Sequence, residues 1–550
     1  MHIVLSRAPE GVVATLLSDD GGQRSEAVTD LATFVAQHER ERPRWVWDDT
    51  AAWYPPLVEA GVRVDRCFDL RLCHAILRGS MLTAGSALAT APAGLWDVPA
   101  EHRTAPADAL FDLEEPAPVA PDALAEFHLQ RAAVAGSPEP GRIDRLLAAE
   151  SAGALIAVEL RHAGLPWRAE EHDRLLSELL GPRPEPGHRP EVLRVLAERI
   201  RDLLGAPALN PDSQPELLAA LQRAGLRVRS TSRWELRELD HPAVVPVLEY
   251  KKLARLLSAN GWNWLDTWVV GGRFRPEYVP GGVVTGRWAT SGGGALQLPR
   301  QLRGAVVADD GWKLVVADAS QLEPRILAAM SGDEGMLRAA AQGDLYAGIV
   351  ASGAARTREE AKLALLGAMY GATTGDSGRL LPRLERAYPK ALALVAEAAR
   401  TGERGGVVST QLGRTSPVPG AGWQRAQQAA ADEGATAAQT SRARADARAW
   451  GRFTRNFVVQ GTAAEWALCW MAGIRTRLRT AYGEAGLLES PHLVFFLHDE
   501  VVVHSPEALA QQAAEAVVEA AQDAGRLVFG ASPATFPLSI AVVDRYSEAK

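Results

Sequence analysis

The sequence is poor in cysteine and has no long apolar run. Only three of its 550 residues are cysteines and none lies in a Cys-x-x-Cys pair, which excludes a disulfide framework and a cysteine-rich structural zinc site. No stretch approaches the ~18 consecutive apolar residues that span a bilayer. The start, MHIVLSRAPEG, lacks the basic-then-apolar layout of a secretion signal. We therefore expect a cytoplasmic protein that does not enter a membrane.

An excess of positive charge is also missing. The 59 basic and 67 acidic residues give a net charge of −8, so no global basic field indicates nucleic acid, although an acidic protein can still carry a locally basic cleft. Only six of the basic residues are lysines. Such a bias over a whole chain is more typical of a G+C-rich genome than of phosphate binding. A lysine retained against this bias, such as Lys362, is therefore informative.

The length predicts two to four domains. Residues 1–80 mix short apolar runs with helical stretches, as a small α/β domain does, and the Ala- and Pro-rich residues 81–122 predict a linker. A helical period covers 123–260, strands and turns are expected over 283–320, and helices resume over 321–400. The composition and this order favour an α/β or α+β fold, rich in helices around a central sheet.

Two carboxylates interrupt apolar β runs. Asp318 follows four apolar residues, and Asp499 lies within 494–503, which reads as one near-continuous β run. A desolvated carboxylate must be paired, hydrogen-bonded or bound to a cation. Either residue alone is most simply a strand-end carboxylate that caps a helix or meets an arginine. Two of them in one chain favour a divalent-metal site, since oxygen ligands suit Mg²⁺.

A third segment, 358–371, predicts a helix with a mixed stripe. Four side chains spaced by four residues, Arg358, Lys362, Leu366 and Tyr370, occupy an arc about 120° wide. Two cations followed by an apolar and an aromatic residue suit a nucleotide, with charges for the phosphates and a flat surface for the base and sugar. An amphipathic helix with solvated cations explains this stripe equally well when the segment is taken alone.

Together these segments resemble the polymerase domain of bacterial DNA polymerase I, a Klenow-like family-A DNA polymerase. The first metal motif of that family, D-Y-S-Q-I-E-L-R, is matched by DASQLEPR at 318–325. The fingers motif R-x-x-A-K-x-x-x-F-G-x-x-Y-G is matched from Arg358 to Gly371 apart from Leu366, and H-D-E is matched at 498–500. Weaker matches fall in the family's order at 210–213, 285–287, 296–299, 413–414 and 452–464.

The resemblance implies a right-hand polymerase with palm, fingers and thumb behind an exonuclease-like (RNase H-like) α/β domain. The boundaries we expect are 1–140 for the exonuclease-like domain, 141–284 for the thumb, 285–335 for the first part of the palm, 336–450 for the fingers and an insertion, and 451–550 for the second part of the palm. Within the fingers, residues 421–450 are longer than the family leads us to expect.

The resemblance also implies two-metal nucleotidyl transfer. Asp318 and Asp499, with the backbone of Ala319, would hold two Mg²⁺, which Mn²⁺ can replace. Glu500 would support this site, and Lys362 would protonate the leaving pyrophosphate. Family resemblance further assigns contacts with the incoming dNTP to Arg358, Lys362, Leu366, Tyr370, Gln321, Glu323 and Tyr346. It assigns contacts with DNA to Thr285, Arg287, Gln297, Arg414, Arg452, Asn456, Gln460 and His498.

Several positions depart from the family's pattern. Ala319 replaces a tyrosine, Tyr346 stands where the family has a phosphate-contacting histidine, and Leu366 replaces the aromatic residue that packs on the incoming sugar. Glu323, which in the family crowds the 2′ position and favours dNTP, is present. We expect an enzyme that works more slowly or discriminates less between sugars.

The proofreading ligands of the family are missing. Residues 1–40 contain no D-x-E, Trp53 stands where a metal-binding aspartate is expected, and 120–150 has no Y-x-x-x-D. We therefore expect no 3′→5′ exonuclease activity. The chain begins directly at this domain, so we also expect the family's 5′-nuclease to be absent and to act, if at all, as a separate partner.

The leading hypothesis is a monomeric, template-directed DNA polymerase without proofreading, which acts on primer–template DNA and dNTPs near the nucleoid in repair or replication. The alternative is a polymerase-like protein that binds DNA or recognises its structure with little or no turnover. The paired carboxylates and the intact fingers motif argue against that alternative, because a protein that only binds DNA does not need them.

Overall fold

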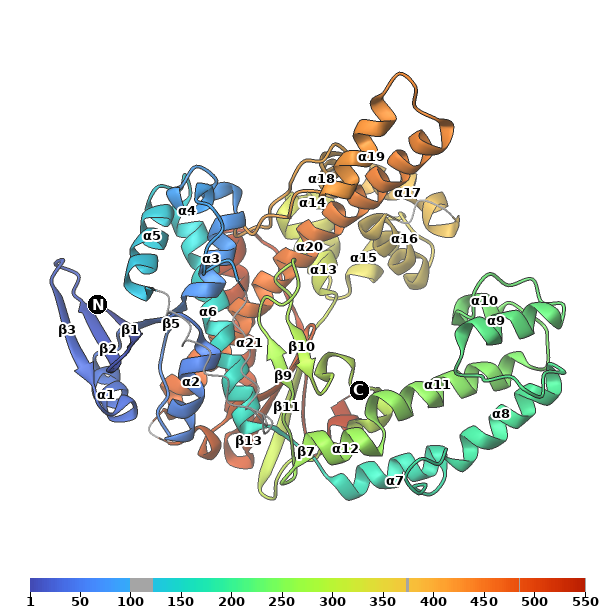
Figure 1. The fold of residues 1–550 in the computed structure, drawn as a ribbon, viewed down its shortest axis with the longest axis horizontal. Helices are drawn as coiled ribbons and strands as arrows, with labels where there is room; N and C mark the ends of the chain where they lie inside the picture. Colours follow the sequence, from blue (N-terminus) through green and yellow to red (C-terminus); the bar gives the residue numbers. More distant parts are fainter. Residues whose placement is uncertain (99–121, 372–374, 484, 550) are drawn as a thin grey trace. The chain divides into compact units, whose positions relative to one another are not determined.

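The computed structural model describes residues 1–98, 122–371, 375–483 and 485–549 (Figure 1). The chain divides into two compact units. The first comprises Met1–His162, Tyr278–Ala289 and Val315–Ala541. The second comprises Ala163–Glu277, Thr290–Leu314 and Val542–Lys550.

The first unit begins with a five-stranded mixed sheet in the order β3-β2-β1-β4-β5. Strands β1 to β3 are antiparallel, and β4 and β5 run parallel to β1. Aromatic side chains of β4 and the following helix, among them Trp45, Trp47, Trp53 and Tyr54, fill the core beside the sheet. The strands are β1 (His2–Ala8), β2 (Gly11–Leu17), β3 (Gln23–Val28), β4 (Arg44–Trp47) and β5 (Cys67–Asp69).

Helices surround this sheet and link it to the rest of the first unit. They are α1 (Leu31–His38), α2 (Thr50–Glu59), α3 (Leu70–Gly79), α4 (Ala87–Thr90), α5 (Ala123–Ala135) and α6 (Pro140–Ala163). The linker expected over 81–122 is wrong for its first part, since η2 (Met81–Thr83) and α4 lie there. Ser86 caps α4 and Ser80 caps η2 through their side chains, which explains the local helices. Residues 99–121 lie outside the described part of the chain.

A buried ion pair joins α6 to the long helix α20 (Ala437–Tyr482). The guanidinium of Arg475 donates to both carboxylate oxygens of Glu159, over 2.8 and 3.0 Å, and the hydroxyl of Tyr54 donates to the same carboxylate over 2.6 Å. Burial alone would raise the pKa of Glu159, but the charges of Arg475 and Arg63 outweigh it and hold that pKa well below its usual range. Removing one partner would leave a buried charge uncompensated, so this contact fixes the N-terminal domain to α20.

A second sheet, in the order β12-β13-β11-β14, lies further along the first unit. The expected continuous β run over 494–503 is wrong: it is an antiparallel hairpin in which Leu497 pairs with Glu500 around the turn residues His498 and Asp499. The turn has only two residues, and apolar residues lie on both sides of it. The sequence pattern therefore resembles one long strand with a polar interruption. The strands are β11 (Trp312–Ala319), β12 (His492–Leu497), β13 (Glu500–Pro506) and β14 (Leu538–Val543).

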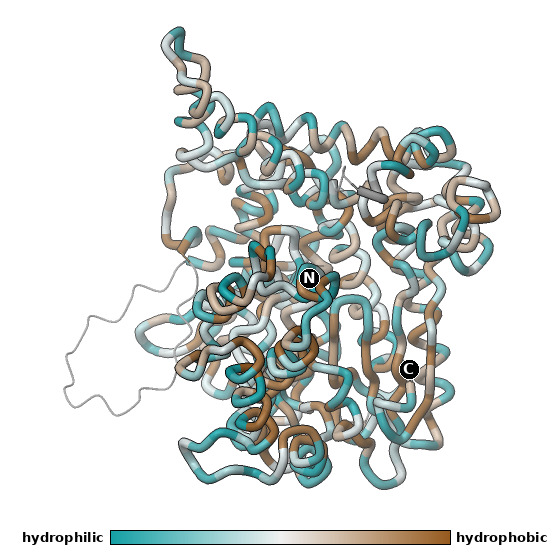
Figure 2. The backbone as a smooth tube through the Cα atoms, turned by 90° about the vertical axis from the view of Figure 1, so that its right-hand side faces the viewer, coloured by the Kyte–Doolittle hydropathy of each residue, from teal (hydrophilic) through white to brown (hydrophobic). Residues whose placement is uncertain are grey.

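Helices follow β11 and account for most of the remaining first unit, as the helical periods predicted. Figure 2 shows hydrophobic and hydrophilic residues alternating along these helices, the pattern of helices with one buried face. They are α13 (Leu322–Ser331), α14 (Glu334–Ala341), α15 (Leu345–Ala351), α16 (Arg358–Tyr370), α17 (Gly375–Ala387), α18 (Pro389–Glu403), α19 (Ala421–Ala431), α20 and α21 (Ala510–Phe529).

The second unit is mainly helical. An aromatic cluster of Trp167, His172, Trp264 and Phe274, with ring centroids 4.8–5.6 Å apart, forms its core next to a small sheet ordered β6-β8-β7. Burial lowers the pKa of His172 to about 4, so this ring is a neutral core residue near pH 7.

The helical period expected over 123–260 is confirmed by α5 and α6, which lie almost wholly in the first unit, and by the helices of the second unit. The helices of the second unit are α7 (Ala169–Leu180), α8 (Glu191–Leu203), α9 (Gln214–Arg223), α10 (Arg233–Arg237), α11 (Val244–Asn260) and α12 (Trp262–Trp268). Its short strands are β6 (Leu165–Pro166), β7 (Val269–Val270) and β8 (Arg273–Phe274), whereas β9 (Glu277–Val279) and β10 (Ala289–Gly292) each have residues in both units. None of the helices described in either unit is both long and apolar enough to cross a bilayer.

A buried carboxyl in α20 gives the fold a pH dependence. Glu465 accepts hydrogen bonds from the hydroxyl of Thr410 and, over 2.8 Å, from the backbone N–H of Leu412. Burial nevertheless raises its pKa to about 7 from an ordinary value of 4.5. Because the folded state then holds the proton more tightly than the unfolded chain, stability is complete below pH 4.5 and is lost as the pH rises towards 7.

Glu465→Gln should therefore stabilise the protein in alkaline solution only. Glutamine can keep both hydrogen bonds without a charge, so we expect a gain of about 3 kcal/mol in the free energy of unfolding at pH 8 and less than about 1 kcal/mol at pH 5. Urea denaturation at the two pH values measures this difference. Equal effects at both would contradict the raised pKa.

Candidate polymerase active site

The two predicted metal ligands lie at adjacent backbone positions. Asp318 is the penultimate residue of β11, and Asp499 is in the turn between β12 and β13. The backbone N–H of Ala319 donates to the carbonyl oxygen of Asp499 over 2.8 Å. Both carboxylate residues are half-buried. Segments 181 positions apart in the sequence (499 − 318) thus bring two acids together at one end of the sheet.

The turn itself is conformationally unusual. His498 has φ of +59°, in the left-handed region that a non-glycine residue rarely adopts. A positive φ at the first of two turn residues suits a tight hairpin whose twist matches that of its strands. Partial burial and the charge of Arg287 lower the pKa of His498. Glu500, the first residue of β13, is only 2% exposed, so its side chain is packed within the protein.

The helix α16 presents the predicted mixed stripe. It begins at Arg358 behind the capping side chain of Thr357, and Gly371 ends it with φ of +77°. Arg358, Lys362 and Tyr370 are exposed and Leu366 is half-buried, while the positions between them include buried alanines and leucines. Gly371 is therefore explained by the left-handed end of the helix.

Arg358, the first cation of this stripe, is bound by Asp344, a residue that the sequence analysis did not single out. Asp344 accepts from the Nε of Arg358 over 2.7 Å and from the Nε2 of Gln321 over 2.6 Å, and it also caps α15. The Arg358 guanidinium lies 5.5 Å from the ring centroid of Tyr346, which is 5% exposed. Burial raises the pKa of Tyr346 to about 12. An aspartate just before a predicted helix is a capping signal, but no spacing indicates its arginine partner.

Glu323 ties α13 to α16. Its carboxylate accepts from the hydroxyl of Tyr370 and from the guanidinium of Arg287. The Glu323 side chain is 16% exposed and that of Arg287 is 38% exposed. Partial burial and the hydrogen bond to Glu323 raise the pKa of the Tyr370 hydroxyl. Glu323, predicted to select the sugar, is thus connected to Tyr370, predicted to contact the dNTP, and to Arg287, predicted to contact DNA.

The buried side chain of Arg325, in the same helix as Glu323, hydrogen-bonds to several surrounding segments. Its side chain is 1% exposed and donates to the carbonyls of Ser320, Ala340 and Thr535 over 2.9–3.2 Å, and to that of Gly343. It also donates to the side chain of Gln321 over 3.3 Å. Arg325 lies within the matched 318–325 motif, yet the sequence alone gave it no structural role.

Residues predicted to contact DNA lie mainly on α20 and the segment before α13. Arg452 is exposed, and Asn456 and Gln460 are half-buried on α20. The Oδ1 of Asn456 and the Oγ1 of Thr285 are buried without a hydrogen-bond partner among the described residues. Buried polar atoms that lack a partner are costly, so a polar ligand at these positions would satisfy them.

Two further predicted residues lie elsewhere. Arg414 pairs with the buried carboxylate of Glu150 over 2.5 Å, and its side chain is only 13% exposed. Burial raises the pKa of Glu150, and the Arg414 charge opposes that rise. Gln297 belongs to the second unit, where it ends η3 (Ala295–Gln297).

The donor set fits a hard divalent cation. Asp318 and Asp499, two half-buried acids on adjacent backbone segments, offer oxygen ligands of the kind that Mg²⁺ prefers. Within the described ranges, no cluster of three or more His, Cys, Asp or Glu side chains is placed to hold a metal. The protein therefore supplies a pair of acids, and substrate phosphates and water would complete a Mg²⁺ shell.

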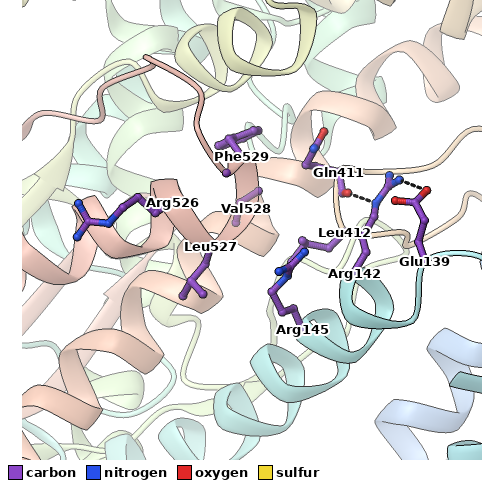
Figure 3. A pocket seen from close by; sticks show the side chains of 10 residues that line it. Glu139, Arg142, Arg145, Gln411, Leu412, Arg526, Leu527, Val528 and Phe529 are labelled. Atoms are coloured by element: carbon purple, nitrogen blue, oxygen red, sulfur yellow. Dashed lines mark hydrogen bonds and ion pairs between the residues drawn. The ribbon is translucent and has the colours of Figure 1, made fainter. Parts of the chain in front are cut away.

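A pocket of about 240 Å³ lies apart from these residues (Figure 3). Arg142 lies at one side of it and donates to Glu139 over 2.9 Å and to the carbonyl of Gln411. None of the predicted site residues lines it. Its walls are formed by Glu139, Arg142, Arg145, Gln411, Leu412, Arg526, Leu527, Val528, Phe529 and Gly530.

The acids of β11 and of the β12–β13 turn, and the stripe on α16, lie within a segment that matches a known family. Residues 190–542 match the sequence profile of DNA polymerase family A. This match covers more than half of the chain, which therefore belongs to DNA polymerase family A.

Individual relatives are distant. The chain is 27% identical to the thermostable DNA polymerase I of Thermus thermophilus over 434 residues, which cover 69% of this chain and 48% of that protein. It is 27% identical to DNA polymerase I of Chloroflexus aurantiacus over 383 residues, covering 60% of this chain and 38% of that protein. The chain thus spans half or less of the length of these relatives.

A solved structure has the same fold over nearly the whole chain. It is the POL domain of Pol1 from M. smegmatis in complex with DNA primer-template and dNTP, with a TM-score of 0.69 and 18% identity, covering 99% of this chain and 95% of that one. The fold is therefore the mixed α/β polymerase fold, and the N-terminal mixed sheet is consistent with an exonuclease-like domain.

The role of Asp344 as the cap of α15 can be tested by substitution. Asp344→Ala removes the cap of α15 and should lower the free energy of unfolding by about 1–2 kcal/mol. Asp344→Asn keeps a good capping side chain and should lose less than about 0.5 kcal/mol. Urea denaturation of both variants decides this, and equal losses would contradict a capping role.

Proposed function

We propose that this chain is a template-directed DNA polymerase that adds dNTPs to a primer 3′-hydroxyl. The observation that carries the proposal is the backbone hydrogen bond from Ala319 to Asp499, which puts the two acids side by side. The exposed cations of α16 and the cluster that Glu323 forms with Tyr370 support it, because they add a phosphate-binding and a nucleoside-binding surface to the same unit.

In this proposal Asp318 and Asp499 hold Mg²⁺, which when bound lowers the pKa of the attacking hydroxyl and offsets charge on the phosphates. Arg358, fixed in direction by Asp344, grips the triphosphate with its remaining donors. Lys362, one turn along α16, is placed to give a proton to the leaving pyrophosphate. Mn²⁺ can take the place of Mg²⁺ because both are hard cations with oxygen ligands.

The nucleoside half of the substrate would meet Leu366 and Tyr370. Leucine offers no flat face, so the sugar gains less stacking contact than an aromatic residue would give. The side chain of Glu323 is held in one position by Arg287 and Tyr370. In that position it would exclude the 2′-hydroxyl of a ribose by steric conflict. Selection of dNTP therefore rests on Glu323 more than on Leu366.

Primer–template DNA would be held by the residues of α20 and the 285–287 segment. Thr285 and Asn456 carry the buried polar atoms without partners, and Arg287 and Gln460 would donate hydrogen bonds to the minor-groove acceptors that all base pairs share. The Pol1 structure, which was determined with DNA primer-template and dNTP, supports this choice of partners. A monomer acting near the nucleoid, with any 5′-nuclease on another chain, is consistent with the proposal.

The proposal includes the absence of proofreading. Strand β1 carries no Asp or Glu, and Trp53 is 2% exposed with its indole N–H donating to Asp48 over 2.5 Å. Asp69 is buried, and its two oxygens accept from the backbone N–H groups of Thr50 and Leu72 over 2.8 and 3.1 Å. These remaining acids serve the starts of helices, so they are not disposed to bind metals.

Primer extension tests the polymerase activity. The protein with Mg²⁺, dNTPs and a primer–template should extend the primer, and Asp318→Ala and Asp499→Ala should each reduce the rate at least about a thousandfold. Asp19→Ala, which alters an exposed aspartate of the N-terminal domain, is the matched control and should extend normally. DNA binding without extension by the unaltered protein would instead favour the alternative, a polymerase-like protein that only binds DNA.

Incubation without dNTPs tests the missing exonuclease. A 5′-labelled primer should keep its full length in Mg²⁺ over hours, because the N-terminal domain has no pair of free acids on β1. Time-dependent shortening from the 3′ end that EDTA abolishes would contradict this expectation.

A further inference from the structure

A helical hairpin formed by α19 and the first turns of α20 has no role in the proposed chemistry. Thr436 caps α20 with a reciprocal hydrogen bond to Gln439, and Gln427 of α19 donates to the carbonyl of Ala443 over 2.8 Å. Figure 1 shows α19 beside the far end of α20, and Figure 2 shows no long hydrophobic stretch at this upper end. The hairpin is therefore an ordered, polar extension of the helix that carries Asn456 and Gln460.

Exposed arginines form a stripe along this helix. At about 100° per residue, Arg444, Arg448, Arg452 and Arg455 fall within an arc of about 80°. The first three are exposed. The buried Ala443 lies outside that arc, against α19. Continued at the same four-residue spacing, the row reaches Asn456 and Gln460, and each step turns about 40° further round the helix.

No acid neutralises this stripe within the described part of the chain. Arg444, Arg448 and Arg452 make no ion pair or hydrogen bond through their side chains there. Asp446, the acid nearest to them on α20, lies roughly 160° round the helix from Arg444. On α8, by contrast, Arg194 pairs with Glu191 and Glu198 over 2.6 and 2.7 Å. Like charges four residues apart destabilise a helix, so a bound anionic ligand would relieve the repulsion between these arginines.

The inner end of the stripe touches the fingers helix. Arg455 donates to the carbonyl of Ala368 in α16 over 2.7 Å. A Cβ added at Gly371, where α16 ends, would lie 3.1 Å from the Cγ of Arg452. The stripe therefore begins beside the proposed nucleotide site and runs away from it along α20.

We infer that Arg444 and Arg448 continue the DNA contact proposed for Arg452 and bind the phosphates of the single-stranded template ahead of the primer end. The inference rests on the proposed function, which places DNA at Asn456 and Gln460. From Gln460 to Arg444 the helix extends about 24 Å, enough for several nucleotides of one strand. A single row of cations on one helix suits one flexible strand, which can follow it, whereas a rigid duplex meets it at few points.

Equilibrium binding of primer–templates with 5′ template overhangs of two and twelve nucleotides tests this inference. The unaltered protein should bind the long overhang more tightly than the short one. Arg444→Gln/Arg448→Gln should weaken binding of the long overhang about tenfold at low salt, lower its salt slope by about 1.4, and leave the short overhang unchanged. Arg444→Lys/Arg448→Lys should keep the preference, since lysine also contacts phosphate.

The control is Arg24→Gln/Arg40→Gln, which removes two exposed arginines from the N-terminal domain and should not alter overhang preference. An unaltered protein without overhang preference, or an equal loss on both overhangs and on blunt duplex, would overturn the inference. Primer extension separates this outcome from failure of the proposed function. An overhang preference that depends on Arg444 and Arg448 in a protein that extends no primer would refute the polymerase and support the strand contact.

Discussion

The pairing of β11 with the turn of the β12–β13 hairpin is the constraint on which the rest of the site depends. One backbone hydrogen bond, from Ala319 to Asp499, makes neighbours of two acids that are far apart in the chain. The apolar residues of β11, β12 and β13 are buried around this hydrogen bond. The sheet is therefore a well-packed support, and the two acids lie half-buried at the end of it. This backbone pairing is what the proposed metal site requires of the fold, because oxygen ligands from two distant segments must meet at one place.

The mixed stripe of α16 is restrained by polar contacts rather than by burial. Asp344 restrains Arg358 at one end of α16, and Glu323 holds Tyr370 at the other. The middle of the helix, with Lys362 exposed, remains open to a ligand. Both contacts involve residues around α13, whose buried Arg325 binds several carbonyls. The same small group of charged residues therefore restrains both Arg358 and Tyr370 of α16.

Much of this arrangement could be predicted from the sequence, because periodic patterns and motif spacing report local structure. The helix at 358–370, the acids at 318 and 499 and the mixed N-terminal α/β domain are of this kind. Contacts between distant segments could not be predicted: no spacing links Asp344 to Arg358, or Glu150 to Arg414. The turn at His498 was hidden because apolar residues flank it on both sides and a positive φ leaves no signature in a histidine.

The central claim is that Asp318 and Asp499 together hold divalent cations. Mn²⁺ binding measured by electron paramagnetic resonance, with a non-hydrolysable dNTP analogue present, tests it most directly. The account predicts bound Mn²⁺ that Mg²⁺ displaces, and loss of binding in both Asp318→Asn and Asp499→Asn, while Asp19→Asn binds normally. Undiminished Mn²⁺ binding in the two site variants would contradict the shared site, and with it the assignment of these residues to catalysis.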